Sequence, residues 1–423
     1  MRELRTPLLR CTTLLLLPAA WAIAPAPAAA QAVGVACTTA PGPNPTFTLR
    51  VSDGYIQLPD GNTMYMWGYA PAGGGFQHPG PTLCVTAGQT VTVVLQNPSP
   101  RPVSIVFPGQ EGVTADGALA QPQLDTGGTL TSLAQAAPPG GSVTYSFVAA
   151  RPGTFPYHSG TDPLTQVRMG LFGALVVRPG VPERAFDRPD SAYTAGEEFM
   201  LLLSEIDPLQ HYAVEGGLPF DPTTYKPRYW LANGRGFPDT IADNGVPWLP
   251  TQPYGALARI HPWSPATHPL PGVVRYLNFG SENYPFHPHG NNGLVVGRDG
   301  FALEGPLGED LAFEKFAINV APGQTWDVLF QWHDAESYSP GNPVPVTVPS
   351  VANLQYGMFY GGSPYLGSTG PLPPGASTLN QCGEYYIITH NHALHQLSAW
   401  GGVVMVGPLT YLRIDPPQPN SCP

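Results

Sequence analysis

Glycine and proline limit the length of regular structure in this chain more than any other feature, supplying 49 and 53 of its 423 residues. Proline disrupts helix interiors, and glycine weakens helices and strands alike. The apolar residues fall into short alternating runs, as at residues 90–96, 142–147 and 171–177. Such alternation, bounded by turn residues, is typical of β-strands. The sequence therefore predicts an all-β protein of sandwich or barrel domains with long Pro/Gly-rich loops.

An internal repeat indicates how many domains there are. Residues 95–109 and 277–290 show the same order of elements, and the strand openings at 139–147 and 322–330 are similar. We predict two homologous β-domains at residues 45–180 and 197–415, with long Pro/Gly-rich insertions in the second.

The first 30 residues are expected to be a targeting segment. Three arginines precede an apolar run that leads into a segment rich in alanine and proline. This is the layout of a cleaved secretory signal, and the run is too short to span a bilayer. We predict an exported protein, periplasmic, extracellular or at the cell surface, with no transmembrane segment.

The charge balance excludes some partners. The formal net charge is -11, and it becomes -13 when the three arginines and one glutamate of residues 1–30 are removed. Nucleic acids and anionic membranes attract basic surfaces, so neither is an expected partner.

Four cysteines remain after the predicted signal, namely Cys37, Cys84, Cys382 and Cys422. An even number in an exported chain indicates two disulfides, with three connectivities open. We favour Cys37–Cys84 and Cys382–Cys422, because each pairing ties a terminal segment to the nearest strand.

Two pairs of histidines carry the main chemical signal. His287 and His289 lie in a Pro-Phe-His-Pro-His-Gly segment, and His390 and His392 lie near the end of the chain. Side chains two residues apart on a strand share a face, so each pair can converge on one metal ion. No cysteine adjoins either pair, and a blue copper centre requires a cysteine thiolate.

The ordered set of motifs resembles the multicopper oxidase family over residues 45–415. The His-containing segment at 284–290 is its most specific part, supported by the segments at 79–82, 170–175 and 233–238. The resemblance implies two Greek-key cupredoxin domains. It also implies four His-x-His pairs around three copper ions and a nearby type 1 site that contains cysteine.

Only part of that ligand set is present. The first His pair falls on Val106 and Pro108, and in the second pair only His158 matches. The third pair is intact at residues 287 and 289. In the fourth, His390 matches in two alternative registers, whereas His392 is a ligand only in the register that aligns residues 390–392 with the family's His-Cys-His.

The resemblance implies that His158 faces His287, His289 and His390 between the two domains. A few neutral imidazoles suit copper best, with zinc as an alternative. The chain is thus expected to be a copper-binding protein with a mononuclear, type-2-like site. A copper-dependent oxidoreductase acting on a small molecule or a metal ion is one outcome, and a metal-free binding or structural module is the alternative. Homo-oligomers fit the resemblance, because two-domain relatives often build copper sites between subunits.

Overall fold

The computed structural model describes residues 33–332, 347–348, 378–379 and 385–417. The described residues belong to one compact unit, and the predicted signal at 1–30 lies outside them. Strands are the main regular structure of the described chain and its helices are few and short, which confirms the prediction of an all-β protein. None of its helices is long and apolar enough to cross a membrane.

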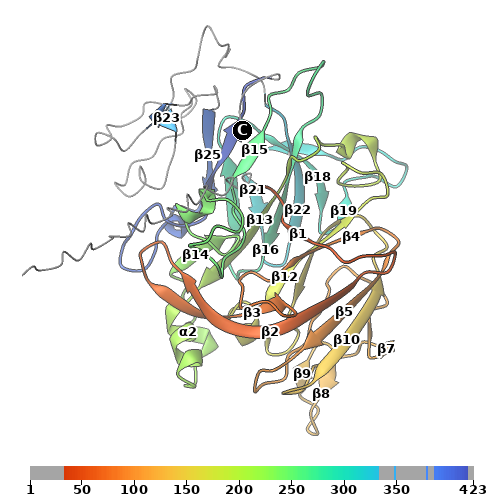
Figure 1. Cartoon of the computed structure of the whole chain (residues 1–423), viewed down its shortest axis with the longest axis vertical. Helices are drawn as coiled ribbons and strands as arrows, with labels where there is room; N and C mark the ends of the chain where they lie inside the picture. The colour runs from red at the N-terminus through yellow and green to blue at the C-terminus, as the bar shows by residue number, and fades with distance from the viewer. Residues whose placement is uncertain (1–32, 333–346, 349–377, 380–384, 418–423) are drawn as a thin grey trace, which may run out of the picture. The chain divides into compact units, whose positions relative to one another are not determined.

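Two sheets contain the strands of the first half of the chain (Figure 1). The four-stranded sheet has the order β1 (Cys37–Thr38), β4 (Thr82–Thr86), β12 (Phe172–Arg178) and β11 (Gly153–His158). The six-stranded sheet has the order β3 (Thr63–Pro71), β2 (Thr46–Gln57), β5 (Thr90–Gln96), β10 (Ser142–Val148), β6 (Thr114–Ala115) and β7 (Ala118–Leu119).

Two further sheets contain the strands of the second half. The seven-stranded sheet has the order β14 (Tyr229–Ala232), β13 (Glu198–Ile206), β16 (Gly272–Asn278), β22 (Thr325–Phe330), β18 (Gly293–Arg298) and β19 (Phe301–Ala302), and β20 (Phe313–Lys315) also pairs with β18. The five-stranded sheet has the order β15 (Ala258–Ile260), β26 (Leu409–Ile414), β25 (Tyr385–Asn391), β17 (Tyr284–Pro288) and β21 (Ile318–Val320).

The remaining elements are short. Two two-stranded sheets pair β8 (Gln123–Leu124) with β9 (Leu130–Ser132) and β23 (Thr347–Val348) with β24 (Thr378–Leu379). The α-helices are α1 (Pro163–Gln166) and α2 (Pro208–Glu215), and the 3₁₀ turns are η1 (Pro189–Ser191), η2 (Pro222–Thr224), η3 (Asp239–Ile241) and η5 (Leu394–Leu397). Helix α2 begins with a proline at its first turn, and the Asp207 side chain accepts a hydrogen bond from the Leu209 amide as its N-cap.

Alternating burial on the predicted strands produces the cores. On β5 the residues Val91, Val93 and Leu95 face inward, and on β10 the same alternation buries Val143 and Phe147. A second core lies between the other two sheets. No described sheet mixes strands from before residue 180 with strands from after residue 197. The predicted domain bounds of 45–180 and 197–415 stay a prediction.

Strand β12 shows where the two pairs of sheets meet. It is buried on both faces, and Phe172, Ala174 and Val176 pack against Met200 and Leu277 of the seven-stranded sheet. A strand covered on both sides lacks a polar face, which explains the continuous apolar run at this point of the sequence.

Candidate metal centre

The two histidine pairs lie side by side on neighbouring strands. Strands β17 and β25 are antiparallel, and His287 is directly opposite His390 in their register. On both strands the alternate residues are buried, whereas His287, His289, His390 and His392 are half-buried or exposed. All four imidazoles therefore stand on the face of the five-stranded sheet that points away from its core.

The rings of these four residues, called here the four-histidine cluster, touch one another. Ring centroids lie 4.7 Å apart for His287–His289, 5.1 Å for His289–His390, 5.2 Å for His287–His392 and 5.6 Å for His390–His392. The Nε2 atoms of His289 and His390 are 3.0 Å apart, within hydrogen-bonding distance.

Backbone carbonyls fix the tautomers of two of the rings. The Nδ1 atom of His287 lies 2.6 Å from the Phe316 carbonyl oxygen, and Nδ1 of His390 lies 2.9 Å from that of Asn391. A carbonyl oxygen only accepts, so both Nδ1 atoms carry the proton and both Nε2 atoms present a lone pair. In the pair at 3.0 Å, His289 is accordingly the donor to His390.

Partial burial favours the neutral form of His289 and His390. Desolvation, reinforced by the neighbouring imidazoles, lowers the pKa of His289 to about 4. Desolvation also lowers the pKa of His390, against the opposing effect of its bond to the Asn391 carbonyl. Neutral imidazole is the form that binds metal ions, because the lone pair must be free.

The cluster is not arranged as a finished coordination sphere. Across the residues that the structure describes, no three His, Cys, Asp or Glu side chains form a group that could hold a metal ion as they stand. The Nε2 atoms of His289 and His390 nevertheless fit one ion, because two ligands ~2.0–2.1 Å from a metal and at right angles lie about 2.9 Å apart.

His158 lies apart from these four residues. It ends strand β11 and lines a separate hollow of about 370 Å³ together with Arg168, Asn278 and Phe279. Burial lowers the pKa of His158, and its Nδ1 lies 2.9 Å from the Ser159 carbonyl oxygen. Within the described ranges, no hydrogen bond or ring contact joins His158 to the four-histidine cluster. The prediction that His158 shares an ion with them has no contact in its favour.

Part of the chain is similar in sequence to a known protein family. Residues 50–181 match the family model described as multicopper oxidase. This segment is therefore similar to a multicopper oxidase domain.

Solved structures of multicopper oxidases share its fold. The multicopper oxidase mgLAC superposes with a TM-score of 0.58 at 20% sequence identity, covering 88% of this chain and 86% of that one. The blue copper oxidase from Nitrosomonas europaea superposes with a TM-score of 0.57 at 20% sequence identity, covering 88% of this chain and 85% of that one. A multicopper oxidase from Pediococcus acidilactici gives 0.52 at 16% identity, with 93% and 61% covered. No curated protein matches the chain by sequence. These likenesses confirm the cupredoxin-like β-sandwich fold.

Polar side chains beside the four-histidine cluster form a hydrogen-bonded network. Asn391 donates to Gln396, whose Nε2 donates to a Glu282 carboxylate oxygen at 2.6 Å. The Tyr284 hydroxyl donates to Glu205 at 2.6 Å, and burial raises the pKa of that carboxyl.

Sequence reasoning missed the carboxylates of this network. Glu205 is buried within β13, whose nine residues are all buried. A carboxylate in an apolar strand is a signal for a paired or hydrogen-bonded group, because an unpaired buried charge is strongly unfavourable. Both cysteines that the structure describes, Cys37 and Cys84, are joined in a disulfide as predicted. Cys382 and Cys422 lie outside the described residues.

Proposed function

We propose that this multicopper-oxidase-like protein binds a single copper ion at the four-histidine cluster. His289 and His390 hold the ion through Nε2, and His287 and His392 are the adjacent imidazoles on the same face. The observation that carries this proposal is the 3.0 Å separation of the two Nε2 atoms. The family implies copper, and imidazole donors suit it.

The residues around the cluster support this assignment. A ligating histidine commonly donates its other ring N–H to a backbone carbonyl, which orients the ring. His287 and His390 both make this bond, to Phe316 and Asn391. The proton that His289 donates to His390 is the one that a metal ion displaces.

Copper bound by imidazoles alone supplies one-electron redox chemistry. The chain contributes neutral ligands, an orientation set by backbone carbonyls, and access, since His392 is exposed. A copper-dependent oxidoreductase is therefore the reaction class we propose. The Cys37–Cys84 disulfide supports export, because disulfides persist in oxidising compartments.

Copper titration of the mature protein tests the proposal. We expect one ion per chain, a tetragonal paramagnetic resonance signal with nitrogen coupling, and no intense thiolate-to-copper absorption. The variants His287→Ala/His289→Ala and His289→Ala/His390→Ala should weaken binding by about 100-fold or more, since the first removes one of the two ligands with an adjacent imidazole and the second removes both ligands. His395→Ala is the matched control, because this exposed histidine contacts Trp230 and Glu282 rather than the cluster.

The competing function is a metal-free module on a cupredoxin scaffold. It is favoured by the absence, in the described part of the chain, of a ready three-residue metal group. Wild-type protein that binds no copper would establish this alternative. Unchanged copper affinity in both double variants would show that copper binds at another site of the protein.

A further inference from the structure

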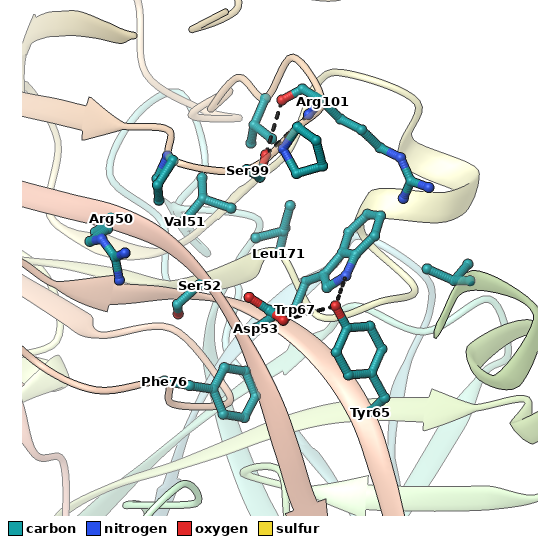
Figure 2. Close-up of a pocket in the computed structure, with 14 residues that line it drawn as sticks. Arg50, Val51, Ser52, Asp53, Tyr65, Trp67, Phe76, Ser99, Arg101 and Leu171 are labelled. Atoms are coloured by element: carbon teal, nitrogen blue, oxygen red, sulfur yellow. Dashed lines mark hydrogen bonds between the residues drawn. The ribbon is translucent and has the colours of Figure 1, made fainter. Parts of the chain in front are cut away.

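A hollow of about 420 Å³ opens on the first half of the chain, remote in sequence from the four-histidine cluster (Figure 2). Strand β2 supplies residues 50–53, strand β3 supplies Tyr65 and Trp67, and the segment 98–103 closes one side. Phe76, Leu171 and Val214 complete the lining. Its volume lies within the range of small-molecule sites.

Apolar side chains form part of the lining of this hollow, called here the β2–β3 pocket. Val51, Val103 and Leu171 are buried, and Trp67 and Phe76 are half-buried aromatic walls.

Two glycines allow the Phe76 ring to pack closely against the strands. A Cβ atom at Gly54 would lie 2.5 Å from a ring carbon of Phe76, and one at Gly68 would lie 3.2 Å from another. Both glycines are on the paired strands β2 and β3. Because neither has a side chain, the Phe76 ring can lie close to the two strands.

The rim of the β2–β3 pocket is cationic. Arg50 and Arg101 are exposed, and Figure 2 shows them on opposite sides of the hollow. Neither makes an ion pair with a carboxylate of the described residues. Asp53 is the one acidic lining residue, and it accepts a hydrogen bond of 3.0 Å from the Tyr65 hydroxyl. The rim therefore has a formal charge of +1 in a chain whose net charge is -11.

Arg101 joins the charge to the aromatic wall. Its guanidinium carbon lies 5.0 Å from the centroid of the Trp67 ring. A guanidinium over an aromatic face keeps the N–H groups of its edge free for a carboxylate, which it can bind through two parallel hydrogen bonds. A planar group and an anionic group can thus be recognised next to each other.

We propose that the β2–β3 pocket binds a small planar carboxylate with an aromatic or apolar body. Arg101 pairs with the carboxylate, the body lies against Trp67 and the buried aliphatic residues, and Arg50 adds positive potential. The pocket shares no lining residue with the four-histidine cluster, so the inference is independent of the copper proposal.

Isothermal titration calorimetry with 2-naphthoate tests this inference. The full mature protein is used with excess chelator, so that copper does not contribute. We expect saturable 1:1 binding of 2-naphthoate and at least about tenfold weaker binding of the neutral isostere 2-naphthamide. Arg101→Gln should weaken naphthoate binding about tenfold, and Arg50→Gln about threefold. Trp67→Leu should weaken the binding of both 2-naphthoate and 2-naphthamide.

Arg298→Gln is the matched control. The Arg298 guanidinium also lies 5.0 Å from a tryptophan ring, that of Trp326, but it does not line the pocket, so naphthoate binding should be unchanged. Circular dichroism melting curves report whether each variant is folded.

Four results would overturn the inference: no naphthoate binding at ~10 mM, equal affinity for naphthamide, less than twofold loss in a folded Arg101→Gln protein, or a greater loss in Arg50→Gln. The inference would also be overturned if inorganic phosphate bound the pocket as tightly as naphthoate, because phosphate has no apolar body.

Discussion

Replacing the buried Arg275 should destabilise the protein by about 3–5 kcal/mol, because the change leaves a buried carboxylate without its cation. Arg275 is fully buried, and its guanidinium donates to Glu198 at 2.8 Å and to Asp327 at 2.7 Å. Although burial opposes its charge, the two carboxylates raise the pKa of Arg275 above its ordinary value. In Arg275→Met, Glu198 keeps its ion pair with Arg178, but Asp327 keeps only the hydroxyl of Thr154.

The hydrogen-bonded group around Arg275 joins the two pairs of sheets. The Thr154 hydroxyl, on β11, donates to Asp327 of β22 at 2.6 Å and accepts from Arg275 at 3.1 Å. Thr154→Val should therefore cost about 1–3 kcal/mol, since it removes a hydrogen bond to a buried charge. Adding Asp327→Asn to Arg275→Met should recover part of the loss, because the uncompensated charge is gone.

Equilibrium urea unfolding, followed by tryptophan fluorescence and far-ultraviolet circular dichroism, measures these differences. The control is Arg298→Met, because Arg298 pairs with Asp299 at 3.3 Å in a half-exposed position. That pair should contribute less than about 1 kcal/mol. If Arg275→Met costs no more than this control, or Asp327→Asn worsens it, the buried ion pair does not stabilise the fold as argued.

Three further changes test other parts of the structure. Replacing Cys37 and Cys84 by serine should cost up to about 4 kcal/mol in urea unfolding, since their bond closes a loop with a sequence separation of 47; no change would contradict this role. Burial lowers the pKa of His78 to about 3. The contribution of the neutral ring to the free energy of unfolding is therefore complete above pH ~6.5, and it falls by up to about 1.4 kcal/mol for each pH unit below that value. His78→Gln should flatten that dependence between pH 7.5 and 5, and an unchanged slope would refute it. Tyr284→Phe should cost about 1–3 kcal/mol by removing the donor to buried Glu205, which a melting curve identical to wild type would exclude.

The strands and the faces of the histidines could be predicted because both depend on local periodicity. The runs at 90–96, 142–147 and 171–177 became β5, β10 and β12 within one residue at each end. His287 and His289 share a face for the same reason, as do His390 and His392. The disulfide between Cys37 and Cys84 also followed from nearness of strands, since β1 pairs with β4.

Contacts that depend on which strands pair and which sheets pack could not be predicted from the sequence. Whether His158 meets the four-histidine cluster depends on how sheets pack, and the structure places it in a hollow with Asn278 and Phe279. Arg275 and Asp327 are 52 residues apart and resemble ordinary surface charges until β16 and β22 pair.

By itself the sequence determined the β-class, the alternation along each strand and the absence of a cysteine beside the histidines, because these are properties of neighbouring residues. Only the tertiary structure decided that His289 and His390, 101 residues apart, place two ring nitrogens 3.0 Å from each other. It also gathered Arg101, Trp67 and Phe76 around one hollow. Such contacts arise from strand register and sheet packing, which sum weak preferences over the whole chain rather than following from any one segment.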